Sequence, residues 1–144
     1  MRGVISIDVL GGDLPRSIKG NKYLLVILCN TTRFVHAIPI PNLRAQTIAT
    51  KLVDFFCFVA FPMTTRCDNM GAFRSHLFEA VSERFGINLA FSAPMHYESH
   101  GGVERVRATI EQMLRKFIHD NPSHWCSLIL FLLMAIREIP HSTT

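Results

Sequence analysis

Three acidic residues of this 144-residue chain occupy positions where a carboxylate needs a specific reason to be present. Asp8 lies inside the apolar run Val4–Leu10, and Asp68 directly follows the short run Met63–Cys67. An unpaired charge inside an apolar strand is costly, so an acid there is expected to have a chemical role. Glu104 follows the glycine pair at 101 and 102 and opens a predicted helix, on the face away from its apolar stripe.

Three converging carboxylates would suit metal-dependent chemistry on a phosphodiester. That chemistry needs an activated hydroxyl and a stabilised leaving oxygen, and two divalent ions roughly 3.5–4 Å apart can serve both. Mg²⁺ prefers oxygen ligands and keeps several waters, and Mn²⁺ can replace it. Each acid alone is a weak signal, because strand-end carboxylates often cap turns and first-turn glutamates often complement the helix dipole. The hypothesis therefore requires the strands that carry Asp8 and Asp68 to be neighbours.

Six of the other eight acids are interpreted as turn, helix-surface or salt-bridge residues. They are Asp13, Asp54, Glu79, Glu83, Glu111 and Glu138.

The apolar patterns predict the elements that would position the three acids. Apolar runs predict five strands, at 4–10, 22–29, 34–40, 63–67 and 88–91. Helical spacing predicts four helices. The first begins at Arg44 with Asn42 as its cap, and the second covers 73–85 and is ended by Gly86. The third begins at 103, and the fourth begins near Pro122 and is ended by Pro140. Pro39 and Pro41 are predicted to end the third strand. The order predicts an α/β fold with a five-stranded mixed sheet flanked by helices, and it resembles the ribonuclease H-like order.

Length and composition favour a single domain over residues 1–144, since 49% of the residues are apolar and can fill one core. The net charge of +4 mildly favours a polyanionic partner such as nucleic acid. The densest basic group lies close to Glu104 and comprises Arg105, Arg107, Arg115 and Lys116.

The cysteines and histidines argue against other kinds of site. The four cysteines lack CxxC spacing and lie in apolar segments, which predicts buried free thiols in a reducing compartment. Of the seven histidines, only His96 and His100 have HxxxH spacing; they lie in a predicted loop, and the sequence contains no HExxH, which disfavours a histidine metal site. The longest apolar stretch, about Trp125–Ile136, is too short to cross a bilayer, and no signal peptide is expected.

The sequence around the three acids resembles the integrase catalytic core of gypsy-type retrotransposons and retroviruses. The signature of that family is an Asp, a second Asp, and a Glu after thirty-five intervening residues, and thirty-five residues separate Asp68 from Glu104. Blocks similar to those of the family cover essentially the whole chain: IDVLGGDLP (7–15), GNKYLLVI (20–27), TTRFVHAIP (31–39), CDNMGAF (67–73), GGVER (101–105) and IREIPHST (136–143).

The resemblance implies a polynucleotidyl transferase with a ribonuclease H-like fold. Asp8, Asp68 and Glu104 would be both the catalytic residues and the ligands of Mg²⁺ or Mn²⁺, with two ions when DNA is bound. The reaction would be two in-line transesterifications, 3′-end processing of the element's DNA and then strand transfer into target DNA. The implied partners are double-stranded DNA and further copies of the chain, as a homodimer or higher oligomer, in the nucleus and with no membrane association.

The expected DNA contacts lie around Glu104. They are Arg105, Arg107, His96, His100 and Arg115. Several positions depart from the family pattern, namely Asn30 for Asp, His96-Tyr97-Glu98 for His-Pro-Gln, His100 for Asn or Asp, Arg107 for Asn, and Ala108 for a basic residue. Neither the amino-terminal zinc module nor the carboxy-terminal DNA-binding module is expected within the chain.

Two other functions are compatible with the same residues. The first is a catalytically impaired or domesticated core that binds DNA or protein, suggested by the altered loop around His96 and by the missing modules. The second is a ribonuclease H-like nuclease or a transposase core, which the spacing of Asp68 and Glu104 disfavours. Joining of a branched DNA substrate distinguishes an active integrase from a binding module.

Overall fold

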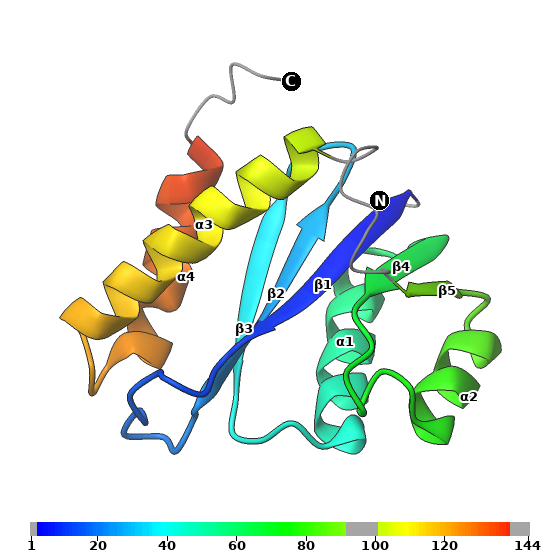
Figure 1. Ribbon diagram of the computed structural model, residues 1–144, viewed down its shortest axis with the longest axis horizontal. Coiled ribbons are helices and arrows are strands. Elements are labelled where there is room, and N and C mark those ends of the chain that lie inside the picture. Colours follow the sequence, from blue (N-terminus) through cyan, green and yellow to red (C-terminus); the bar gives the residue numbers. More distant parts are fainter. Residues whose placement is uncertain (1–2, 92–100, 139–144) are drawn as a thin grey trace.

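The computed structural model describes residues 3–91 and 101–138, except for the side chains of residues 101–104. Within this part the helices and strands follow one another in the predicted order (Figure 1). The strands are β1 (Val4–Leu10), β2 (Tyr23–Cys29), β3 (Val35–Ile40), β4 (Thr64–Cys67) and β5 (Asn88–Phe91). The helices are α1 (Ala45–Val59), α2 (His76–Arg84), α3 (Gly101–Asp120) and α4 (Trp125–Glu138).

The strands form one five-stranded mixed sheet in the order β3-β2-β1-β4-β5. β1 and β2 pair antiparallel, as do β2 and β3, whereas β4 pairs parallel with both β1 and β5. Figure 1 shows α3 and α4 on one side of the sheet and α1 and α2 on the other. The predicted α/β architecture is therefore confirmed, and β1 lies at the centre of the sheet beside β4.

β1 sends alternate side chains to the two faces of the sheet. Ile5 and Ile7 belong to the apolar core beneath α1 and α2, whereas Leu10 belongs to the second core beneath α3 and α4. Because side chains alternate along a strand, Asp8 shares the face of Leu10. The central strand thus presents one carboxylate to the layer formed by α3 and α4.

The helices α3 and α4 cover this face with residues at helical spacing. From α3 come Ile110, Leu114 and Ile118, and from α4 come Trp125, Ile129, Leu133 and Ile136. Trp125 is fully buried, and its indole Nε1 donates a hydrogen bond of 2.8 Å to the carbonyl of Pro15. The outer side of α4 exposes Leu130, Phe131 and Met134. The apolar residues of α4 therefore include both core residues and exposed ones.

Two predictions about chain breaks were wrong. Pro39 does not end β3 but lies within it, paired with Leu24 of β2. β3 is an edge strand, where a residue without a backbone N–H is tolerated. Asn42 is not the cap of α1, because the N-cap is Arg44. The Asn42 Oδ1 atom instead accepts hydrogen bonds from Arg44 N at 3.0 Å and Thr47 Oγ1 at 2.7 Å, which stabilises the turn before the helix.

Other boundaries shift for local reasons. Phe73 lies in the turn before α2, because Ser75 caps the helix by accepting a hydrogen bond from Phe78 N at 3.1 Å. The last helix begins at Trp125, three residues after Pro122. Buried thiols were predicted for all the cysteines, but only Cys29 and Cys67 are buried, whereas Cys126 is half-buried and Cys57 is exposed on α1. In the described ranges, no helix combines the length and the apolar character that a membrane span requires.

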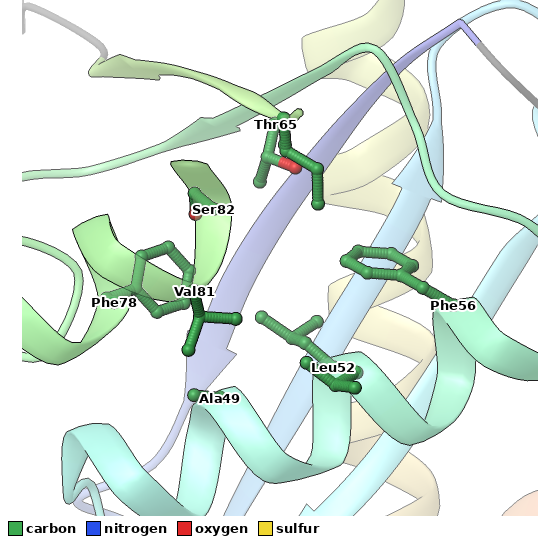
Figure 2. A pocket seen from close by; sticks show the side chains of 9 residues that line it. Ala49, Leu52, Phe56, Thr65, Phe78, Val81 and Ser82 are labelled. Carbon is green, nitrogen blue, oxygen red and sulfur yellow. The ribbon is translucent and has the colours of Figure 1, made fainter. Parts of the chain in front are cut away.

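A small apolar cavity of about 20 Å³ lies between α1, α2 and β4 (Figure 2). Leu52 and Phe56 of α1 face Phe78 and Val81 of α2 across it. The cavity adjoins the core that contains Ile5 and Ile7, so it lies on the face of the sheet opposite to Asp8. It is part of the packing between the two helices and is separate from the acidic residues.

Candidate active site

The pairing of β1 with β4 puts two of the three predicted acids at the same end of two neighbouring strands. Val4 pairs with Thr64 and Ser6 with Arg66, an offset of 60 residue numbers. The next residue of β1 on the face of Ser6 is Asp8, and Asp68 is one residue beyond the end of β4. Continued for two residues past the last pair, the same offset would put Asp68 opposite Asp8, on strands about 4.8 Å apart.

The carboxylates of both acids are oriented by backbone N–H groups. Asp8 Oδ1 accepts a hydrogen bond from Val9 N at 2.9 Å. Asp68 Oδ1 accepts one from Met70 N at 2.8 Å, the bond of an Asx turn, and the Asp68 side chain is exposed. Each acid therefore has one oxygen fixed by the backbone. The neighbour of Asp68, Cys67, is buried in the opposite core, as the alternation along β4 requires.

A second set of contacts holds the segment that follows Asp68. The Asn69 Oδ1 atom accepts hydrogen bonds from Arg74 Nε at 3.0 Å and Arg74 Nη2 at 2.7 Å. The Arg74 guanidinium also lies over the ring of Phe91, 3.7 Å from its centroid, at the end of β5. Arg74 thus ties the Asp68 turn to the neighbouring strand, which fixes the backbone that carries the carboxylate. This contact could not be predicted from the sequence.

Helix α3 adds two charged side chains to the face of Asp8. Arg107 Nη1 lies 3.9 Å from Asp8 Oδ2, and Arg107 Nε lies 3.7 Å from Glu111 Oε2. Arg107 and Glu111 are four residues apart, so they lie on one side of the helix. The side chains of Asp8 and Arg107 are each 27% exposed and that of Glu111 is 19% exposed, so the group is largely shielded from water.

Glu111 is a site residue that sequence reasoning missed. It was assigned to the helix surface, but it lies against Asp8. Burial, then the negative charge of Asp8 and a hydrogen bond with it, raises the pKa of Glu111 to about 7, while Arg107 and Arg115 act in the opposite direction. The one available signal was the seven-residue spacing from Glu104, which is two helical turns and places both positions on one face.

Some predicted site residues lie outside the described part of the chain. Glu104 belongs to the first turn of α3, one turn before Arg107, but its side chain is among those not described. His96 and His100 fall in the range 92–100, which is also outside it. The described side chains contain no group of three or more His, Cys, Asp or Glu that could hold a metal ion. The metal-binding role of all three acids thus remains a prediction.

The basic residues near the site are partly engaged by acids. Arg115 Nη1 lies 2.6 Å from Asp13 Oδ1, and this contact together with the charge of Arg115 lowers the pKa of Asp13. Lys116 pairs with Asp120 at 3.6 Å. Arg105 is exposed on α3. The basic group read from the sequence is therefore less positive in the folded chain than its residue types suggest, and the DNA contacts of Arg105, Arg107 and Arg115 remain predictions.

Comparison with known proteins identifies the family. The family model of the integrase core domain matches residues 1–97, which is about two thirds of the chain and includes Asp8 and Asp68. The chain belongs to the integrase core family. Integrase cores are polynucleotidyl transferases, a class of DNA-processing enzymes that generally use divalent metal ions, bind DNA and oligomerise.

Curated relatives are polyproteins of transposons and retroviruses. The chain is 29% identical over 122 residues to the retrovirus-related Pol polyprotein from transposon 412 of Drosophila melanogaster, covering 84% of this chain and 10% of that protein. It is 30% identical over 132 residues to the Pro-Pol polyprotein of simian foamy virus type 1, covering 92% of this chain and 11% of that protein. The integrase core therefore spans about a tenth of the length of these relatives.

A solved structure shows the same fold. The crystal structure of the catalytic core domain of BIV integrase superposes with a TM-score of 0.76 at 16% sequence identity, covering 99% of this chain and 88% of that chain. The ribonuclease H-like architecture predicted from the element order is thereby confirmed.

Proposed function

We propose that this integrase core is a metal-dependent enzyme that processes DNA 3′ ends and transfers them into target DNA. Its ligands for Mg²⁺ or Mn²⁺ would be Asp8, Asp68 and Glu104, with two ions when DNA is bound. The observation that carries the proposal is the β1–β4 register, whose offset of 60, continued two residues beyond the last pair, would align Asp8 with Asp68 on one face of the sheet. Membership of the integrase core family supports the same reaction class.

The donor set fits such ions. Asp8 and Asp68 offer carboxylate oxygens, which Mg²⁺ and Mn²⁺ prefer, and the sulfur of the neighbouring Cys67 is buried on the opposite face. When bound, two ions would supply an activated oxygen nucleophile and a stabilised leaving oxygen. α3 packs on the same face through Ile110 and Leu114, and Glu104 in its first turn would supply the third carboxylate.

The protein's own contribution is to hold these groups before DNA arrives. The Val9 and Met70 N–H groups fix one oxygen of each aspartate, and the contacts of Arg74 fix the turn that carries Asp68. Preorganised charge at a reacting phosphate needs little reorganisation during the reaction. Water would be the nucleophile in 3′-end processing, and a 3′-hydroxyl in strand transfer.

The proposed activity implies particular partners, a cellular location and an assembly. The partners would be the double-stranded DNA of the element's ends and of its target, bound in part through Arg105, Arg107, Arg115, His96 and His100. Work on chromosomal DNA would require a nuclear location and assembly of two or more copies. We treat residues 1–144 as one catalytic core domain.

A branched DNA substrate tests the proposed activity. With Mn²⁺ or Mg²⁺, the wild-type chain is expected to cleave and rejoin the branch, and Asp68→Asn is expected to lower the rate about 100-fold or more, the scale of losing one electrostatic group in an active site. Asn keeps an oxygen for the bond from Met70 N, so the fold should survive the change. Asp54→Asn, at an exposed position on α1, is the matched control.

The outcomes separate the proposal from its alternatives. Equal background rates from wild type and Asp68→Asn, with DNA still bound, would favour a core that only binds DNA. Cleavage of the RNA strand of a hybrid without any joining would favour a ribonuclease H-like nuclease. Equal losses in Asp68→Asn and Asp54→Asn would mean that the site lies elsewhere.

A further inference from the structure

Arg107 lies between two carboxylates at the candidate site. Its Nη1 atom is 3.9 Å from Asp8 Oδ2 and its Nε atom is 3.7 Å from Glu111 Oε2. Both separations exceed the 2.7–2.9 Å typical of a charge-assisted hydrogen bond. By contrast, Arg115 on the same helix lies 2.6 Å from Asp13. Arg107 therefore interacts electrostatically with both acids, at distances longer than those of a direct hydrogen bond.

We propose that Arg107 is a tethered cation that competes with the divalent metal ion for Asp8. The inference rests on the metal-binding role proposed above for Asp8. In the metal-free chain the guanidinium offsets the negative charge of Asp8, and a metal ion must displace it to reach the same carboxylate. Glu111 is the partner that Arg107 keeps after this displacement.

The competition follows from the positions of the charges. A metal ion held by Asp8 and Asp68 on this face would lie within a few ångströms of the guanidinium, because Arg107 approaches the Oδ2 atom that the backbone leaves open. Like charges at that distance repel strongly, and partial burial of Asp8 and Arg107 weakens the screening by salt. A side chain tethered on α3 also has a high effective concentration at Asp8 that dilution cannot lower.

Glu111 can remain an ion-pair partner of Arg107 when the guanidinium moves away from Asp8. Glu111 is one helical turn further along α3, and its Oε2 atom already faces the Nε atom of Arg107. A change of side-chain rotamer would increase the distance to Asp8 while the contact with Glu111 persists. The helix backbone need not move. Displacement gives up the ion-pair contact with Asp8, which opposes metal binding, while the contact with Glu111 keeps the guanidinium paired.

Metal-dependent thermal stabilisation measures this competition directly. Unfolding of the chain is followed by the fluorescence of Trp125, the single tryptophan, at increasing Mn²⁺ concentration without DNA. Arg107→Gln removes the competing charge and is expected to lower the Mn²⁺ concentration for half-maximal stabilisation about tenfold. Arg107→Lys keeps a positive charge and is expected to stay close to the wild type.

Arg115→Gln is the matched control, because it removes the same charge from the same helix two turns away, where the partner is Asp13. It is expected to change the half-maximal concentration less than about twofold. If Arg107→Gln does not fold, Arg107→Met keeps the aliphatic stem and removes the same charge.

Three results would overturn the inference. An unchanged or higher Mn²⁺ requirement in Arg107→Gln would make Arg107 neutral or supportive at the site. Equal shifts of the half-maximal Mn²⁺ concentration in Arg107→Gln and Arg115→Gln would mean that the effect comes from the net charge of the chain. The absence of any Mn²⁺ response in the wild type and all variants would contradict both the metal site and the proposed function. In the first two cases the wild type still responds to Mn²⁺, so those results contradict only the role of Arg107.

Discussion

His36 should make the stability of the chain depend on pH. It lies on β3, where its ring stacks on Phe55 of α1 with centroids 4.8 Å apart. The Nη2 atom of Arg137 from α4 lies 2.9 Å from its Nδ1 atom. Arg137 is itself held by a 2.8 Å hydrogen bond from its Nε atom to the Val35 carbonyl. Burial, and then the positive charge of Arg137, lowers the pKa of His36 from 6.5 to about 4.

The direction of the pH effect follows from the proton balance. The unfolded chain takes up a proton at His36 near pH 6.5, whereas the folded chain resists it until about pH 4. The contribution to stability is therefore fully present above pH 6.5 and is lost as the pH falls from 6.5 towards 4. The full shift corresponds to about 3 kcal/mol, and screening of the partly exposed ring reduces it to about 1–2 kcal/mol.

The assay compares urea unfolding of wild type and His36→Phe, followed by Trp125 fluorescence, at about pH 7 and about pH 4.5. Phenylalanine keeps the stacking on Phe55 and has no titratable group, and the loss of the Arg137 contact is the same at both pH values. Between these pH values the wild type should lose about 1–2 kcal/mol more than the variant. Glu111, whose raised pKa has the opposite effect, is common to both proteins and cancels. Equal pH dependence in the two proteins would refute the reasoning.

Two further predictions concern packing. Leu114→Ala should lower the free energy of unfolding by about 3 kcal/mol, because Leu114 is a fully buried residue of α3 and the change leaves a cavity. A loss below about 1 kcal/mol, measured by urea unfolding, would contradict this packing. Gly11→Ala should cost about 1–3 kcal/mol, because a Cβ atom there would come 1.9 Å from the Tyr23 ring. Gly71→Ala, where a Cβ atom meets nothing within 4 Å, is its control, and equal melting temperatures of the two variants would be the contrary result.

The sequence by itself determined the order of the elements and the residues that line the core. Ile5 and Ile7 alternate with Asp8, and Ile110, Leu114 and Ile118 repeat at helical spacing, so local periodicity fixed the buried faces. The same alternation made Asp8 conspicuous as a charge within an apolar strand. These features depend only on neighbours along the chain, which is why they could be predicted.

Only the tertiary structure decided which distant residues meet. The parallel pairing of β1 with β4 puts Asp8 and Asp68 at the same end of neighbouring strands, and the approach of α3 brings Arg107 and Glu111 to the Asp8 carboxylate. Glu111 looked like a surface acid in the sequence, because its unusual property comes from burial and from a charge about a hundred residues away. Electrostatic interactions depend on distance through space, and a one-dimensional pattern does not contain that distance.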